Sequence, residues 1–215
     1  MWDEKTLLRY LARNDAANFY GLGHGCPPGT TYDGEPFGGS FLALMYKDLN
    51  RKLKHRYRFA FLDGCLTDSD ELLRAFGADS TEIGAEQPLP IGYYIHNKRP
   101  AAFLCWSTTV PARVPLDPPL PDGTSWQQYA ALCNWHQEIV FYWTLEGYTL
   151  EDAVAQANWL AMSPGSSPQP RPVSVKDKAN HAVPFSTVDN LRCHGYSELR
   201  FNEFNHRTDT WPWWP

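Results

Sequence analysis

The sequence predicts an α/β fold in which a mainly parallel sheet carries helices on both faces, a three-layer arrangement. Three short apolar stretches, at 17–22, 58–62 and 101–109, have the composition and length of buried strands. Segments whose apolar residues recur at helical spacing lie between them, at 40–55 and 71–76. Such an alternation of strands and helices favours parallel strands joined by crossover helices.

Size, charge and cysteine usage narrow the possible classes of function. The 215 residues, 43% of them hydrophobic, suffice for one domain with a full core. With 24 acidic and 19 basic side chains the formal net charge is -5, so we expect no nucleic-acid partner. No apolar run approaches the roughly 18 residues of a membrane span, and the first residues lack the apolar region of a signal peptide. The odd number of cysteines favours free thiols. We therefore expect a cytoplasmic protein that does not bind membranes.

The first elements are expected to lead into a glycine-rich turn. A short helix is predicted at 6–13 because its leucines share one face. The strand at 17–22 then stops at Gly23-His24-Gly25. The next helix is predicted to start with Ser40 as its N-cap and to reach about His55, with basic residues in its last turns, where cations suit the helix dipole.

The second strand, at 58–62, also ends at a glycine turn, Asp63-Gly64-Cys65. Asp68 or Ser69 is expected to cap the helix that follows at 71–76. The two strands therefore end in similar turns, and each turn presents one reactive side chain.

The C-terminal half is predicted to hold two further helices and an extension. The helices are expected at 126–146 and at 149–161, the second with a capping box at its start. Beyond them, 162–215 is rich in proline and tryptophan and begins with a loop. A final edge strand is expected within 196–204. We therefore predict a core of 1–161 followed by an extension of 162–215.

His24 and Cys65 are the candidate catalytic residues, because each is presented by the glycine turn that ends a buried strand. If the two strands are neighbours in a parallel sheet, their ends lie about 4.8 Å apart at the carboxyl edge, where open α/β sheets place their sites. An imidazole beside a thiol can help form the thiolate and can protonate a leaving amine near neutral pH. The pair predicts a Cys-His dyad.

Gly25 is the candidate backbone donor beside this dyad. A residue without a side chain lets the backbone approach a substrate carbonyl closely. The N–H groups of Gly25 and Cys65 are therefore expected to form an oxyanion hole, in which each donor contributes about 3 kcal/mol in other hydrolases.

An apolar strand ending in His-Gly, a crossover helix, and an apolar strand ending in Asp63-Gly64-Cys65 resemble the caspase-like cysteine peptidases, including metacaspases, clostripain and gingipains. The similarity extends over about 15–160, because the predicted helix pair near 145–153 also resembles bacterial relatives called CHAT domains. The resemblance implies a caspase-like fold and an endopeptidase with Cys65 as nucleophile and His24 as general base and acid. It implies a polypeptide substrate and requires no cofactor and no metal.

The resemblance also implies a substrate pocket. In metacaspases and clostripain an acid two residues before the cysteine lies in the pocket for the residue before the cut, and Asp63 has this position. The stretch that includes Trp106 and Ser107 resembles the strand that walls the same pocket. A carboxylate in that place would attract a cation, so cleavage after arginine or lysine is the expected specificity.

The sequence departs from the family before the histidine strand. Only one short helix precedes that strand, whereas the relatives have two further strands with their helices. We therefore expect either that the chain belongs to a longer protein or that a partner covers the exposed sheet edge.

Two other functions fit the same residues. A family member without activity would serve as a scaffold for protein interactions. Alternatively, His24 with Cys26, and Cys133 with His136, could together hold a tetrahedral zinc ion, although neither spacing is the usual paired form.

The remaining cysteines and aromatic residues are expected to be structural. Cys105 is expected to be a small buried hydrophobe, and Cys193 and His194 ordinary surface residues in a loop. The tryptophans at helical spacing are expected in the core, whereas the tail at 211–214 would form an apolar patch that docks onto its own domain or a partner. These tryptophans are Trp126, Trp135, Trp143 and Trp159.

Overall fold

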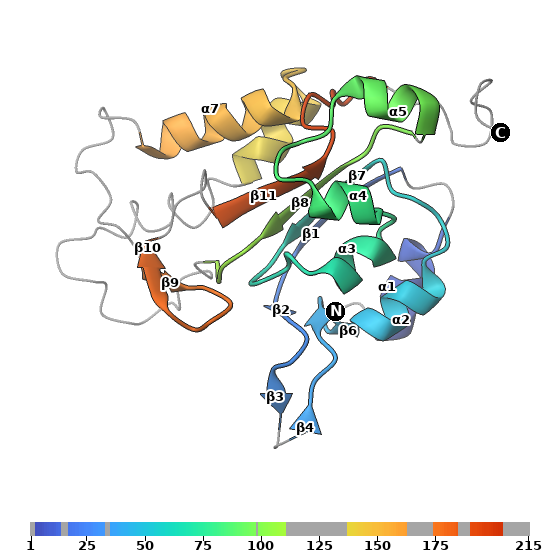
Figure 1. The fold of residues 1–215 in the computed structure, drawn as a ribbon, viewed down its shortest axis with the longest axis vertical. Coiled ribbons are helices and arrows are strands. Elements are labelled where there is room, and N and C mark those ends of the chain that lie inside the picture. The colour runs from blue at the N-terminus through green and yellow to red at the C-terminus, as the bar shows by residue number, and fades with distance from the viewer. Residues whose placement is uncertain are drawn as a thin grey trace. The chain divides into compact units, whose positions relative to one another are not determined.

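The fold is given by a computed structural model, which describes residues 3–13, 17–32, 35–97, 99–110, 137–162, 174–184 and 190–203 (Figure 1). The chain divides into two compact units. The first comprises Met1–Ser107, Leu191–Ser197 and Phe204–Pro215, and the second comprises Thr108–Asn190 and Glu198–Glu203. The predicted division between core and extension falls at 161–162, next to residues outside this description, and stays a prediction.

A four-stranded sheet forms the centre of the first unit (Figure 1). Its order is β1 (Asn18–Leu22), β7 (Phe59–Asp63), β8 (Ala102–Trp106) and β11 (Leu191–Gly195). The first three strands are parallel, and β11 runs antiparallel to β8. The predicted α/β class and the mainly parallel sheet are therefore confirmed, and three of the strands lie where apolar composition predicted them.

Three helices pack on one face of this sheet. They are α1 (Glu4–Leu11), α2 (Tyr46–Lys52) and α3 (Asp70–Ala75). Their apolar side chains form one core with alternate residues of the strands, such as Leu62 and Cys105. Helices α1 and α3 agree with the sequence prediction within a few residues, because each has a clear apolar face.

Two further helices, α4 (Ser80–Gly84) and α5 (Ile91–Asn97), were not predicted. Both are too short for a periodic signal. A buried ion pair anchors α4: Glu82 is fully buried and accepts two hydrogen bonds from Arg56, at 2.5 and 2.8 Å.

The helix predicted from Ser40 to His55 begins later than expected. Residues 40–45 form a hairpin of β5 (Ser40–Phe41) and β6 (Leu44–Met45) instead. Its turn residues, Leu42 and Ala43, have left-handed φ values of 54° and 62°, which a helix cannot contain. Helix α2 therefore starts at Tyr46. The hairpin extends through β2 (Gly25–Cys26), which pairs with β5.

The last strand of the sheet was also misplaced. It was expected within 196–204 but lies at Leu191–Gly195, so the predicted loop position of Cys193 and His194 is wrong. Burial along β11 does not alternate between the faces, so the sequence carries no two-residue period there. Two small hairpins complete the described strands and were not predicted. They are β3 (Thr31–Tyr32) with β4 (Glu35–Pro36), and β9 (Ser174–Lys176) with β10 (Ala182–Pro184).

The second unit contains a helical segment at 137–144 and α7 (Leu150–Met162). The predicted start of α7 is confirmed, because Thr149 accepts a hydrogen bond from the Asp152 N–H at 3.1 Å. Trp143 lies in the core as expected, and its Nε1 donates to the Leu199 carbonyl at 2.8 Å. None of the helices that the structure describes is long and apolar enough to cross a membrane.

Candidate functional site

The two predicted site turns lie side by side at the carboxyl edge of the sheet. Strands β1 and β7 are adjacent and parallel, in a register that pairs Leu22 with Asp63. The pairing continues into the turn, because the Gly23 N–H donates to the Asp63 carbonyl at 3.0 Å. The turns that carry His24 and Cys65 therefore follow two adjacent strand ends.

Glycine is required where the two turns touch. A Cβ on Gly25 would lie 2.2 Å from the Cys65 carbonyl oxygen, and one on Gly64 would lie 2.5 Å from the Gly23 carbonyl oxygen. Real Cβ atoms do not approach backbone this closely, so the turns pack backbone against backbone. The close approach that sequence reasoning assigned to a substrate carbonyl is made here by the chain itself.

The N–H of Gly25 points away from the neighbouring hairpin. The Leu42 N–H donates to the His24 carbonyl at 3.0 Å, which makes these two residues a hydrogen-bonded pair. In an antiparallel ladder the next pair, Gly25 with Phe41, is then of the non-bonded kind. The Gly25 N–H is therefore directed to the side opposite β5, and its role in an oxyanion hole stays a prediction.

Thr67 holds the loop that carries Cys65. Its hydroxyl lies 2.6 Å from the Leu62 carbonyl and 3.0 Å from the Gly64 carbonyl, and it accepts from the Trp106 N–H at 3.1 Å. Thr67 is fully buried, whereas Cys65 is half-buried and His24 exposed. Sequence reasoning missed Thr67, because a single threonine in a loop gives no periodic signal. The loop of Cys65 is thus held in place, and both predicted catalytic residues remain accessible.

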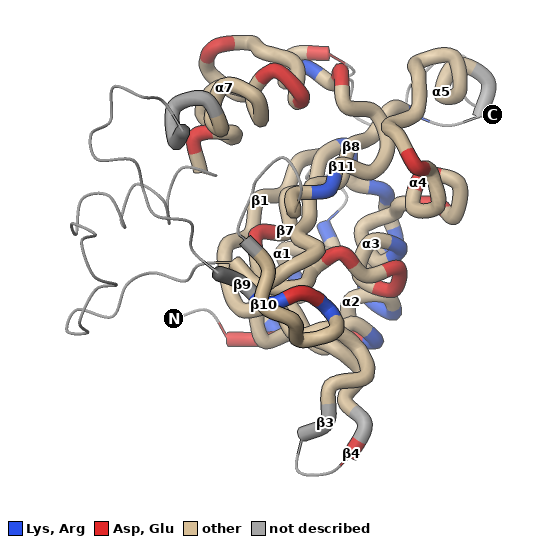
Figure 2. The backbone as a smooth tube through the Cα atoms, turned by 60° about the vertical axis from the view of Figure 1, so that its left-hand side comes forward, with Lys and Arg blue, Asp and Glu red and all other residues tan. Residues whose placement is uncertain are grey.

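The Asp63 carboxylate is closed off from solvent. It is the only charged residue of β7 (Figure 2) and is 0% exposed. The Tyr20 hydroxyl donates to one of its oxygens and the Trp106 Nε1 to the other, both at 3.0 Å. Burial and the nearby carboxylate raise the pKa of Tyr20 well above its usual value. The acid predicted to attract a substrate cation is thus bound by two protein donors, and Trp106 is buried with it, beside half-buried Ser107.

A second group of reactive side chains lies on the helix-covered face of the sheet. Nε2 of His194 is 2.9 Å from Oδ1 of Asp68, and Sγ of Cys105 is 3.7 Å from the same oxygen. Sequence reasoning treated Cys105 as a buried hydrophobe and His194 as a surface residue. The group forms because β11 pairs with β8, and no local sequence pattern predicts this pairing.

The other predicted ligand set is only partly described. His24 and Cys26 lie on either side of Gly25, whereas Cys133 and His136 fall outside the described residues, as do Trp126, Trp135 and the tail at 211–214. The alternative zinc site built from these pairs stays a prediction.

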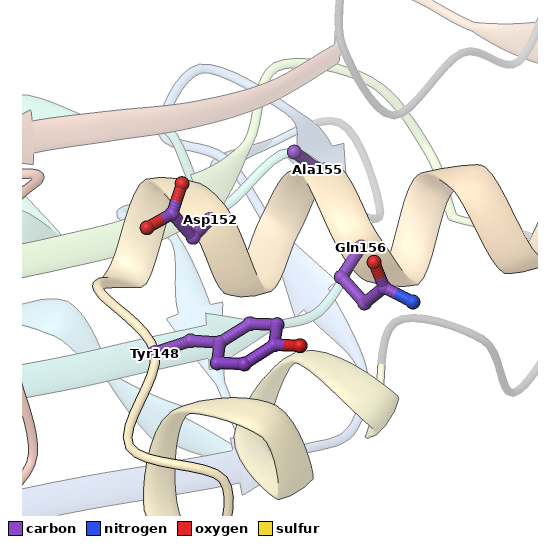
Figure 3. A pocket seen from close by; sticks show the side chains of 4 residues that line it. All are labelled: Tyr148, Asp152, Ala155 and Gln156. Carbon is purple, nitrogen blue, oxygen red and sulfur yellow. The ribbon is translucent and has the colours of Figure 1, made fainter.

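A surface pocket of the second unit is lined by Tyr148, Asp152, Ala155 and Gln156, the last three on α7 (Figure 3). Among the described residues, its lining contains neither cysteine nor histidine. None of the predicted catalytic residues lines it.

Comparison with protein-family models, with curated proteins and with solved structures finds no match for this chain.

Proposed function

We propose that the chain is a cysteine endopeptidase of the caspase-like kind, with Cys65 as nucleophile and His24 as general base and acid. The register of β1 with β7 supports the proposal most directly, because it brings the two reactive turns together at the carboxyl edge of a parallel sheet. Two further features agree with it: both side chains are accessible, and the loop of Cys65 is fixed by Thr67.

In the proposed mechanism His24 takes the thiol proton and Cys65 sulfur attacks the substrate carbonyl carbon. The N–H groups of Gly25 and Cys65 hold the resulting oxyanion. His24 then gives its proton to the leaving amine, and the C–N bond breaks to leave a thioester. Water, deprotonated by His24, hydrolyses the thioester and restores the thiol. The mechanism needs no cofactor and acts on a polypeptide.

Cleavage after arginine or lysine is the specificity proposed for this enzyme. Because Asp63 is buried, this specificity requires a rearrangement of the groups around its carboxylate. A substrate cation can reach the carboxylate only by displacing Tyr20 or Trp106. Tyr20 is the easier donor to displace, since its side chain is 37% exposed whereas Trp106 is fully buried. A pocket formed with Trp106 and Ser107 would then open only when a substrate binds.

The second candidate is a caspase-like scaffold without activity. The closed Asp63 carboxylate favours it, as does the edge strand β1, which pairs on one side only among the described residues. An unpaired edge accepts a strand from a partner or from a further part of the protein. A cytoplasmic location is proposed for either candidate, because an odd number of cysteines suits a reducing compartment.

Cleavage of a peptide library tests the two candidates and the specificity together. The peptidase proposal predicts cleavage after arginine or lysine that is absent from both Cys65→Ala and His24→Ala. Cys193→Ala is the matched control and should retain full activity. Cleavage after aspartate would overturn the specificity alone, whereas no cleavage by folded protein would favour the scaffold.

A further inference from the structure

The cluster of Asp68, Cys105 and His194 has the composition and spacing of a metal site. Their ligand atoms, a carboxylate oxygen, a thiol sulfur and an imidazole nitrogen, all lie within 4.8 Å of one another. We propose that these three residues bind a zinc ion. This inference does not depend on the peptidase proposal.

Two of the three ligand separations lie near the values of tetrahedral zinc, and the third is within 4.8 Å. With usual zinc–ligand bond lengths, a tetrahedral angle separates oxygen from nitrogen by about 3.3 Å and oxygen from sulfur by about 3.6 Å. The corresponding separations are 2.9 Å between Asp68 and His194 and 3.7 Å between Asp68 and Cys105. Shifts of a few tenths of an ångström would bring these two separations to the tetrahedral values.

The three ligands come from three segments that are separate in the sequence and fixed by backbone hydrogen bonds. Cys105 on β8 and His194 on β11 come from paired strands and face the same side of the sheet, because Cys105 opposes Arg192 and Phe103 opposes His194 in the register. Asp68 is fixed from its own backbone, whose N–H donates to the Trp106 carbonyl at 3.0 Å. Such preorganisation on rigid elements is what a metal site needs.

The burial of the cluster favours a metal over a second catalytic thiol. Cys105 is 0% exposed, so a substrate cannot reach its sulfur. The side chains of His194 and Asp68 are 12% and 21% exposed, which leaves one side of the cluster open to solvent. A zinc ion with three protein ligands takes a water molecule as its fourth ligand on such a side.

The ligand set selects the class of metal. Thiolate and imidazole favour zinc over magnesium or calcium, which prefer oxygen. Binding requires the Cys105 thiol to release its proton to solvent as sulfur bonds to the metal. Because Asp68 follows Cys65 by three residues, the ion would tie the loop of the proposed nucleophile to β8 and β11.

Metal titration of the reduced, chelator-stripped chain tests the proposal. Zn²⁺ should bind in one equivalent, and at 100 times its dissociation constant it should raise the ratio of folded to unfolded protein about 100-fold. Co²⁺, used as a coloured substitute, should give the absorption band of a cobalt–thiolate bond. The band should vanish in Cys105→Ala. Asp68→Asn and His194→Gln should weaken binding by more than the roughly 100-fold typical of changes outside the ligand set.

The controls separate loss of a ligand from loss of the fold. Asp68→Asn changes a partly exposed loop residue, and its far-ultraviolet circular dichroism should match the unmodified chain. Cys193→Ala lies on the same strand as His194 and should keep the band. The proposal is overturned if folded protein shows no cobalt–thiolate band, if the band survives in Cys105→Ala, or if Cys26→Ala removes it.

Discussion

At the scale of single residues, the buried Asp63 carboxylate is the feature most sensitive to substitution. Trp106→Phe removes the Nε1 donor from an oxygen that water cannot reach, since both residues are fully buried. We expect unfolding free energy to fall by about 2–3 kcal/mol. Tyr20→Phe should lower it by less, because the 37% exposed side chain leaves room for water to replace the hydroxyl. Chemical denaturation measures the unfolding free energy of both variants. A larger loss in Tyr20→Phe than in Trp106→Phe would contradict the burial of Trp106.

Substitution of Tyr46 is expected to raise stability instead of lowering it. Its side chain is fully buried, and its hydroxyl has no hydrogen-bond partner among the described residues. Tyr46→Phe removes this unsatisfied group, so we expect stability to rise by about 1 kcal/mol at neutral pH.

The same residue predicts a dependence on pH. Burial raises the pKa of Tyr46 in the folded chain, so the unfolded chain ionises first as pH rises above about 10. The unmodified chain then loses stability that Tyr46→Phe keeps, and the difference between them should widen with rising pH. Denaturation at pH 8 and pH 11 checks this. A constant difference would show that the hydroxyl is solvated in the folded state.

At the scale of elements, the β5–β6 turn carries strain beside the site. Ala43 has a φ of 62°, which costs about 1 kcal/mol for a residue with a Cβ. The strained turn places Leu42 over the strand end before His24, since a Cβ on Gly23 would lie 2.3 Å from Leu42 Cδ2.

Replacement of Ala43 measures this strain. Ala43→Gly should raise unfolding free energy by about 0.5–1 kcal/mol, because glycine adopts positive φ freely. Ala85→Gly is the matched control, since Ala85 has a φ of -71° and glycine there should destabilise. Equal effects of the two substitutions would mean that the turn is not strained.

Elements with contiguous local signals were predictable from the sequence. Strand β8 is an unbroken apolar run, β7 is apolar up to Asp63, and β1 is largely apolar after Asn18. Helices α1 and α7 carry an apolar face or a capping residue. The β5–β6 hairpin was not predictable, because leucines at 42, 49 and 53 imitate helical spacing while the turn depends on strained φ values. Strand β11 escaped notice because it joins the sheet from a distance in sequence and its burial does not alternate.

At the scale of the whole molecule, the candidate site depends on one topological fact. The sequence placed His24 and Cys65 at the ends of two strands, and the parallel pairing of those strands brings the turns together. The state of Asp63 could not be foreseen, since its donors Tyr20 and Trp106 come from two different strands. The Asp68, Cys105 and His194 cluster likewise needs three separated segments.

Selective labelling of Cys65 tests the proposed Cys-His dyad. The chain is treated with a peptidyl electrophile that traps cysteine peptidases, and the modified peptides are identified by mass spectrometry. We expect Cys65 to react much faster than Cys26 and Cys193, and His24→Ala to abolish this advantage without unfolding the chain, since His24 is exposed. Equal labelling of the three cysteines in folded protein, or labelling of Cys65 unchanged by His24→Ala, would contradict the Cys-His dyad.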